Sequence, residues 1–514
     1  MKSCVKKSVM FRIFGPPGTG KTTTLLDMVD KALVAGVPAN TIAFLAFTRK
    51  AATEAKERAA QRFNLDIKHD LPFFRTLHSL ALQCSDIQKD QIMQPEHYKE
   101  LSNSMGVSLV TQVWSDFSED ITDISSTNDP ILGIINLARL RKVDLRKQYN
   151  ESRLEYDWTT VNYVNKSLTE YKKAYNLFDF TDMLEQFVLT SEINCPRFSM
   201  TFLDEAQDLS PLQWDIAYAL DKKSEKMYAA GDDDQAIYRW AGADVDAFIN
   251  LDGSSETLTQ SHRIPKNAHI LAEKIARRIH RRFPKQYKPR EVLGRVERIN
   301  TVSSLNMDHG SWLILAQAGY VLNPVTADLR GFGYLFNYRG LRSISERISS
   351  AVNGWEQLRI GEEVSGEVAK KIYSFMSSNI RIKRGFKRLT SVMDDEFLTL
   401  CTLQERQGLL ATEDMEWHVA MDKLPDTDRA YISKLLRKGE DFNKPPRITV
   451  STIHGAKGGE ADNVVLFTDL SPAAEEDMRL NPDDMHRVFY VGVTRTKDNL
   501  YIVEAEDANR SYDL

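Results

Sequence analysis

The residues with the clearest chemical meaning lie near the start of the chain, in the segment Gly15-Pro16-Pro17-Gly18-Thr19-Gly20-Lys21-Thr22. An apolar run at residues 9–14 precedes this segment, and a helical pattern at residues 24–29 follows it. In the order strand, loop, helix, such glycines let backbone N–H groups surround phosphate oxygens at a helix N-terminus. Lys21 would hold the β- and γ-phosphates and the Thr22 hydroxyl would bind Mg²⁺. The segment therefore predicts a site for ATP with Mg²⁺.

The nucleotide-binding residues expected from this segment are Gly15, Pro16, Pro17, Gly18, Thr19, Gly20, Lys21, Thr22 and Thr23.

Two acids end a second apolar run, Met200 to Leu203, which has the composition of a buried strand. Asp204 would ligate Mg²⁺ through water, and Glu205 would orient and deprotonate the water that attacks the γ-phosphate. An Asp-Glu pair at a strand end is common by itself. Here Ala206-Gln207-Asp208 follows, which makes the pattern more specific.

Further segments follow in a fixed order along the chain. They are Ala46 to Ala52 (AFTRKAA), Thr76-Leu77-His78-Ser79, Gly231 to Trp240 (GDDDQAIYRW), Gln260-Ser261-His262-Arg263, Thr452 to Glu460 (TIHGAKGGE) and Tyr490 to Thr496 (YVGVTRT). With the acidic segment at residues 204–208 they resemble the motifs of superfamily 1 helicases of the UvrD/Rep branch. The resemblance covers nearly the whole chain, and the segment at residues 231–240 is its most specific part.

The resemblance implies how hydrolysis would be performed. Gln235 would hydrogen-bond both the γ-phosphate and the attacking water. Arg263 and Arg495 would reach across a cleft and stabilise transition-state charge, as arginine fingers do. Cleft closure would then depend on ATP. His262 would stack on the base and Glu460 would face the nucleotide sugar.

The expected catalytic residues are thus Lys21, Glu205, Gln235, Arg263 and Arg495, with Thr22 and Asp204 as metal ligands.

A strand-binding surface is expected beside the ATPase motifs. Single strands are held without sequence preference by aromatic faces stacked on bases, with cations and hydroxyls on phosphates. Trp240 is the strongest candidate platform, because Arg239 and the small segment at residues 241–243 flank it rather than an apolar run. The complete set of expected nucleic-acid contacts is Phe47, Arg49, His78, Tyr238, Arg239, Trp240, Thr452 and His454.

The resemblance implies an α/β chain with two RecA-like (P-loop NTPase) doubly wound parallel-sheet domains, each carrying a mainly helical insertion. The expected boundaries are 1–84 and 175–257 for the first ATPase domain (1A), 85–174 for its insertion (1B), 258–345 and 446–514 for the second domain (2A), and 346–445 for a reduced insertion (2B). A strand is expected at Trp312 to Ala316.

Three departures from the family pattern bear on specificity. Only 14 residues precede Gly15, and none forms the glutamine segment that reads adenine in the family. We therefore expect appreciable use of other purine triphosphates; a GTP rate below about one-hundredth of the ATP rate would contradict this. His262 replaces the usual aromatic residue, and Ala241 replaces the usual arginine after the tryptophan.

Composition is neutral about partners. The net charge of −5 gives no global attraction to nucleic acid, so binding must come from a local groove. Basic clusters at Arg277-Arg278, Arg281-Arg282 and residues 381–388 could bind phosphates, although a solvated helix face is commoner. The four cysteines are far apart in the sequence and form no metal-binding motif, which fits a protein of a reducing cytosol. No apolar run approaches the roughly 20 residues of a membrane helix.

The sequence thus predicts an ATP-dependent single-stranded DNA translocase and DNA helicase, moving 3′ to 5′ as in the family, in a bacterial or phage-infected cytoplasm. Its expected partners are single-stranded DNA, duplex junctions, and single-strand-binding or replication and repair proteins, with the chain a monomer or weak dimer. Two alternatives remain. One is a superfamily 1 RNA helicase; the other is a nucleoprotein-remodelling ATPase that does not unwind.

Overall fold

The computed structural model describes residues 10–47, 49–110, 129–442 and 444–514, with the side chains of residues 49 and 50 excepted. The chain divides into two compact units. Unit 1 comprises Met1–Arg298 and Ile453–Leu514, and unit 2 comprises Ile299–Thr452. Each unit is described below by itself.

A six-stranded sheet lies at the centre of unit 1, with the strand order β3-β2-β4-β5-β1-β6 and parallel pairing throughout. All five residues of β2 are buried, as expected of a parallel strand that is covered on both faces. The strands are β1 (Phe11–Phe14), β2 (Ile42–Ala46), β3 (Phe74–Thr76), β4 (Phe198–Leu203), β5 (Ser224–Gly231) and β6 (Ser255–Thr257).

Helices pack on this sheet through their apolar faces. Leu25, Leu26 and Val29 of α1 and Ala55 and Ala59 of α2 join residues of the strands in one buried core. The helices that belong with the sheet are α1 (Lys21–Val34), α2 (Arg49–Phe63), α3 (Leu77–Gln83), α8 (Phe180–Asn194), α9 (Pro211–Lys223) and α10 (Val245–Ile249).

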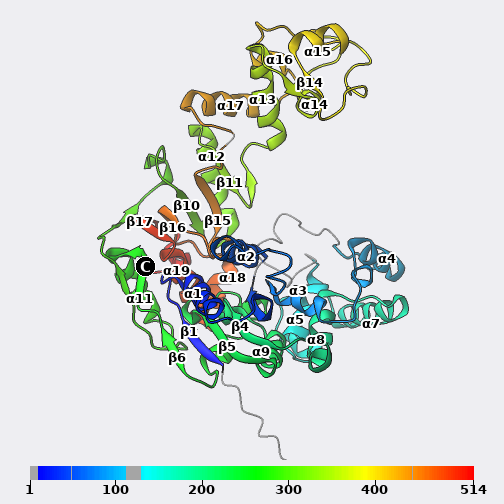
Figure 1. The fold of residues 1–514 in the computed structure, drawn as a ribbon. Coiled ribbons are helices and arrows are strands. Elements are labelled where there is room, and N and C mark those ends of the chain that lie inside the picture. The colour runs from blue at the N-terminus through cyan, green and yellow to red at the C-terminus, as the bar shows by residue number, and fades with distance from the viewer. Residues whose placement is uncertain (1–9, 48, 111–128, 443) are drawn as a thin grey trace, which may run out of the picture. The chain divides into compact units, whose positions relative to one another are not determined.

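The described residues between α3 and α8 are mainly helical and have a core of their own, built largely from α4, α5 and α7 (Figure 1). Aspartates begin two of these helices: Asp129 accepts hydrogen bonds from the N–H groups of Ile131 and Leu132, and Asp157 from that of Thr160. The helices are α4 (Pro95–Met105), α5 (Pro130–Leu140), α6 (Leu145–Asn150) and α7 (Trp158–Tyr175).

The rest of unit 1 combines two distant segments of the sequence. Strand β7 pairs in parallel with β8, and β16 pairs in parallel with β17. Helix α11 packs against α19. These elements are β7 (Gln260–Pro265), α11 (Lys266–Ala276), β8 (Lys288–Arg290), β9 (Arg295–Ile299), β16 (Ala461–Phe467), α18 (Pro472–Leu480), α19 (Pro482–Val493) and β17 (Thr496–Val503).

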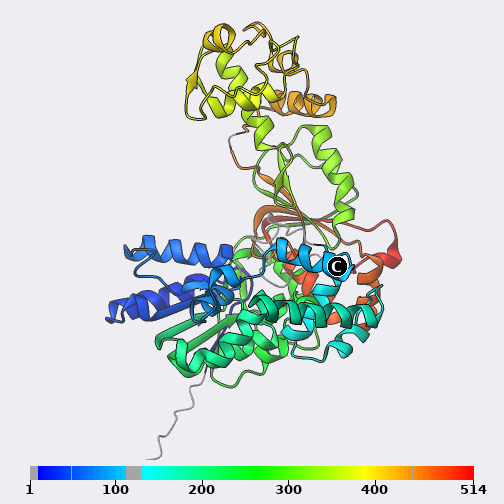
Figure 2. The same cartoon turned by 90° about the vertical axis from the view of Figure 1, so that its right-hand side faces the viewer.

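Unit 2 combines a small strand layer with a helical part. Strand β15 (Ile448–Thr452) pairs in parallel with β10 (Trp312–Ala316) and β11 (Phe336–Tyr338), and β12 (Leu341–Arg342) pairs antiparallel with β11. Within this unit, helices α13 to α16 lie together beyond the strands in both views (Figures 1 and 2). The remaining elements are α12 (Asn323–Phe332), α13 (Glu346–Arg359), β13 (Val364–Ser365), α14 (Gly366–Ser374), β14 (Phe397–Leu398), α15 (Leu400–Arg406), α16 (Trp417–Ala420) and α17 (Asp426–Lys438).

The predicted fold class is confirmed: the chain is α/β, with the parallel-strand sheets of two RecA-like domains. The strand expected at Trp312 to Ala316 is β10, and the acids Asp204 and Glu205 directly follow β4. The finer division into 1A, 1B, 2A and 2B stays a prediction. No helix in the described part of the chain is both long and apolar enough to cross a membrane.

Candidate functional site

The loop between β1 and α1 has a shape that only its glycines allow. Gly18 and Gly20 have φ angles of 71° and 78°, in the left-handed region. A Cβ on Gly18 would lie 2.4 Å from the Cβ of Arg263, so the loop backbone approaches β7 too closely for any other residue. The Thr19 hydroxyl donates to the Pro16 carbonyl at 2.8 Å and closes the turn.

The predicted phosphate-binding and acidic residues meet at the end of this loop. The Lys21 ammonium lies 2.7 Å from Oε1 of Glu205 and 3.8 Å from Oδ1 of Asp204. The Thr22 hydroxyl donates to Oδ2 of Asp204 at 2.8 Å. Glu205 has a φ of 55°, in the left-handed region, which is a strained conformation for a residue with a side chain.

Burial and neighbouring charges shift the pKa values of the three carboxylates in this cluster in different directions. Burial alone would raise the pKa of Glu205, but the ammonium groups of Lys21 and Lys457 outweigh it and lower the pKa to about 2. Burial raises the pKa of Asp208 to about 6, although Lys457 opposes the shift. Burial also raises the pKa of Asp204, against the effect of Lys21. Glu205 is therefore ionised at neutral pH, as a general base requires.

Gln207 connects this cluster to the segment after β5, and Gln235, within that segment, contacts Arg495. The Gln207 amide donates to Oε2 of Glu205 at 2.5 Å, and its carbonyl oxygen accepts from the Asp232 N–H at 2.9 Å. The Gln235 amide donates to Oδ2 of Asp232 at 2.6 Å. Its carbonyl oxygen accepts from Nη2 of Arg495 at 2.7 Å. Both ends of the Gln235 side chain are thus held.

Of the two predicted arginine fingers, Arg495 is almost fully buried and Arg263 is partly exposed. Burial, followed by repulsion from Arg263, lowers the pKa of Arg495 to about 9, so it keeps its charge at neutral pH. Arg263 donates to Oε2 of Glu460 at 2.5 Å, and Glu460 also pairs with Lys497 at 2.7 Å. Because the charge of Arg263 lowers the pKa of Arg495, the two guanidiniums lie in the same part of the site.

His262 is exposed and lies directly before Arg263 in β7. Its backbone N–H donates to the Gly18 carbonyl at 2.8 Å, which fixes β7 against the phosphate-binding loop. Next to it, the Ser261 hydroxyl donates to the Pro17 carbonyl at 2.8 Å.

The predicted aromatic contacts form a group in which only Trp240 is widely exposed. Phe47 and Tyr238 are buried and stack on each other with ring centroids 5.8 Å apart. The Trp240 side chain is 59% exposed and meets Tyr238 and His454 edge-on, at 6.4 and 6.2 Å. The Tyr238 hydroxyl donates to the His454 carbonyl at 3.2 Å. Trp240 therefore presents the accessible face of this group.

The other predicted nucleic-acid contacts are more scattered. Arg239 pairs with Asp484 at 3.2 Å. Arg49 begins α2, and its side chain lies outside the described residues. Thr452 ends β15 in unit 2. His78 is buried in α3, where its ring meets Phe180 edge-on at 6.4 Å.

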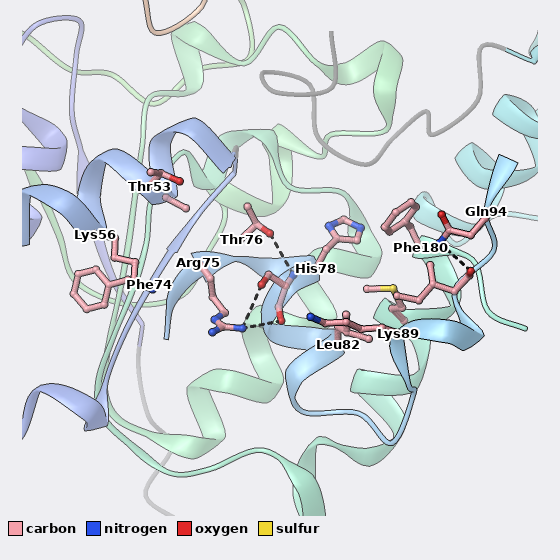
Figure 3. A pocket seen from close by; sticks show the side chains of 14 residues that line it. Thr53, Lys56, Phe74, Arg75, Thr76, His78, Leu82, Lys89, Gln94 and Phe180 are labelled. Carbon is pink, nitrogen blue, oxygen red and sulfur yellow. Dashed lines mark hydrogen bonds between the residues drawn. The ribbon is translucent and has the colours of Figure 1, made fainter. Parts of the chain in front are cut away.

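A pocket of about 610 Å³ opens beside His78, between α2, β3, α3 and the start of α8 (Figure 3). Three cations line it: Lys56, Arg75 and Lys89. Arg75 donates to the carbonyl and hydroxyl oxygens of Ser79, both at 3.3 Å. Burial and then the charge of Arg75 lower the pKa of Lys56. The pocket therefore has the charge expected of an anion-binding site.

Sequence reasoning missed the role of Lys457, which lies between the acids and the aromatic group. Its ammonium binds Asp208 and donates to the main-chain carbonyl of Gln235 at 2.9 Å. It also lies 4.8 Å from the centre of the Tyr238 ring. The one sequence signal that could have identified Lys457 is its position within the segment at residues 452–460.

The interpretation of Arg282 as a phosphate contact or solvated residue was wrong, because this arginine binds Asp234.

Together, the strand–loop–helix phosphate cradle after β1 and the two acids that follow β4, a parallel strand of the same sheet, define a P-loop ATPase with a RecA-like sheet. Two family models match the chain. The UvrD/REP helicase N-terminal domain matches residues 4–256, and the UvrD-like helicase C-terminal domain matches residues 427–507. The chain belongs to the UvrD/Rep helicase family.

Curated relatives span almost the whole chain at low identity. It is 21% identical to the ATP-dependent DNA helicase PcrA of Leuconostoc citreum, over 96% of this chain and 79% of the relative. It is 22% identical to the ATP-dependent DNA helicase PcrA of Bacillus subtilis, over 95% and 80%. It is 23% identical to a probable DNA helicase II homologue of Rickettsia conorii, over 97% and 90%.

Proposed function

We propose that this chain is an ATP-dependent DNA helicase that moves along single-stranded DNA in the 3′-to-5′ direction. The observation that carries the proposal is the gathering of five predicted catalytic residues from distant parts of the sequence. Lys21 contacts Glu205, and Gln235 contacts Arg495, each at 2.7 Å. Arg263 lies against the phosphate-binding loop at Gly18.

The residues present fit MgATP. Any side chain on Gly18 would collide with β7, and the left-handed Gly18 and Gly20 bring the loop to the N-terminus of α1, where a phosphate can bind. Thr22 and Asp204 supply the paired oxygens that Mg²⁺ prefers. When bound, Mg²⁺ would neutralise charge on the β- and γ-phosphates. Lys21 would exchange its contact with Glu205 for the phosphates.

Hydrolysis would then depend on three tasks, each performed by different residues. Glu205, released from Lys21 and still oriented by Gln207, would accept the proton of the attacking water. Gln235 would position that water against the γ-phosphate. Arg495 and Arg263 would stabilise the charge that develops in the transition state. His262 and Glu460 would contact the nucleoside.

The DNA strand would run past Trp240 and the pocket beside His78. Trp240 offers an exposed ring for one base, worth roughly 1–3 kcal/mol. Lys56, Arg75 and Lys89 would bind backbone phosphates, because each is a cation facing the pocket. Partners in the cell would be duplex junctions and proteins that handle single strands.

The test is ATP hydrolysis without nucleic acid, with single-stranded DNA and with single-stranded RNA, using Lys21→Ala as the inactive reference. The proposal expects strong stimulation by DNA, little by RNA, and loss of activity in the variant. Displacement of a labelled strand from duplexes with a 3′ or a 5′ overhang then tests direction. Stimulation by neither nucleic acid would refute the motor and favour a remodelling ATPase, while stimulation by RNA would favour an RNA helicase.

A further inference from the structure

A buried lysine lies at the centre of three consecutive aspartates. The ammonium of Lys285 is 3.0 Å from Oδ1 of Asp232, 2.6 Å from Oδ1 of Asp233 and 2.7 Å from Oδ2 of Asp234. Its side chain is only 1% exposed, and the three carboxylates are equally buried. Burying a charge is costly unless it is paired, and the three carboxylates supply that pairing for Lys285.

The surrounding segment reinforces the contact. Arg282 grips both oxygens of Asp234, at 2.8 and 2.6 Å, and the Phe283 N–H donates to Asp233 at 2.7 Å. The Phe283 ring stacks on Phe14 at 4.0 Å with an interplanar angle of 5°. Phe14 is the last residue before the phosphate-binding loop. The segment at residues 282–285 is thus anchored to both strands that lead into the ATP site.

The three aspartates differ in the contact that the second carboxylate oxygen of each one makes. Asp232 alone uses its second oxygen, Oδ2, to accept from the Gln235 amide at 2.6 Å. The second oxygen of Asp233 accepts from the Phe283 N–H, and that of Asp234 from Arg282. Of the three aspartates, Asp232 is therefore the one whose side chain contacts both Lys285 and Gln235, and Gln235 in turn contacts Arg495.

We propose that Lys285 is a positioning residue for ATP hydrolysis: through Asp232 it fixes the Gln235 side chain in the orientation that meets the γ-phosphate and Arg495. The proposal rests on the function proposed above. Without the lysine, Oδ1 of Asp232 would keep the longer contact from the Asp234 N–H, at 3.3 Å, so Asp232 could turn and the Gln235 amide would lose the partner that determines which of its ends faces Arg495. Lys285 is almost fully buried among the three aspartates, so it acts on hydrolysis through this chain of contacts.

The chain offers a matched pair of variants. Asp232→Asn and Asp233→Asn make the same change at equally buried positions, and each removes one carboxylate from Lys285. The amide introduced at position 232 could accept from Gln235 or face Lys285 with its oxygen, but it could not do both. The amide introduced at position 233 has no contact with Gln235.

We expect Asp232→Asn to lower the kcat of DNA-stimulated hydrolysis by about tenfold or more, with the KM for ATP within about threefold of wild type. Asp233→Asn should keep kcat within about twofold. Thermal unfolding of both variants, with and without ATP, reports the structural effect separately. Equal losses of kcat in both variants, or an unchanged kcat in Asp232→Asn, would overturn the proposal.

Should Asp232→Asn fail to fold, the double variant Lys285→Met with Asp233→Asn removes one charge of each sign and still frees Asp232. It should show the same tenfold loss of kcat, and a kcat like that of Asp233→Asn alone would overturn the proposal. A wild-type protein with no DNA-stimulated hydrolysis would instead refute the proposed function, so the two failures are distinguishable.

Discussion

Glu205→Gln should separate ATP binding from hydrolysis. The substitution keeps the size of the side chain and the acceptor for the Gln207 amide, but removes the charge that binds Lys21 at 2.7 Å. Lys21 would then face phosphates without competition from the Glu205 carboxylate, its nearer partner, so ATP affinity should hold or rise. Loss of a general base typically costs 10²–10⁴ in kcat. This corresponds to roughly 3–5 kcal/mol of barrier height.

The same variant has a folding cost that depends on pH. The pKa of Glu205 falls from an ordinary value of 4.5 to about 2 in the folded state. That difference corresponds to roughly 3 kcal/mol of folding free energy. Because the side chain is 31% exposed, solvent screening reduces it to about 1–2 kcal/mol. A lowered pKa stabilises the folded protein above pH 4.5, and this contribution is lost as the pH falls toward 2.

The assay combines steady-state hydrolysis with single-stranded DNA, equilibrium binding of a fluorescent ATP analogue, and urea unfolding at pH 7 and near pH 3. Glu225→Gln is the control, because Glu225 is an exposed acid of β5 outside the site. A kcat above about one-tenth of wild type, or loss of ATP binding in a folded variant, would refute the assignment of Glu205 as the base.

Two further predictions concern the strand and the arginine fingers. Trp240→Ala should weaken single-stranded DNA binding by about 5- to 150-fold, the equivalent of one stacked base. It should leave thermal stability nearly unchanged because the ring is 59% exposed; fluorescence anisotropy with a labelled oligonucleotide checks this, and unaltered affinity would contradict it. Arg495→Ala should lower kcat by about 10³-fold or more while the folded protein still binds ATP; single-turnover hydrolysis beside a binding titration checks this, and a loss confined to binding would contradict it.

The sequence predicted the parts of the site that local chemistry specifies. The glycine spacing before Lys21 determines the loop, and an apolar run followed by Asp204 and Glu205 predicts a strand that ends in acids. The exposure of Trp240 was also predictable, since small and polar neighbours leave it no apolar surface to pack against. Phe47, which we expected as a nucleic-acid contact, is buried, and its ring stacks on Tyr238.

The contacts that hold these parts together could not be predicted, because they join residues far apart in sequence. Lys285 and Asp233 are separated by 52 positions, and Lys457 and Asp208 by 249. Nothing local distinguishes Arg282 from the neighbouring arginines of its basic cluster. Only packing shows that Arg282 meets a buried aspartate, while Arg277 stays at the surface beside Glu273.

Lys457 explains how nucleotide chemistry and strand contact could influence each other. Its ammonium binds Asp208, which shares Gln207 with Glu205, and so it belongs to the hydrolytic cluster. It also donates to the Gln235 carbonyl and lies over the Tyr238 ring, whose neighbour is the exposed Trp240. Any change in charge at Glu205 alters the field at Lys457, since the two groups interact across a buried space. Lys457 is therefore the cation that connects the acidic cluster with the aromatic group.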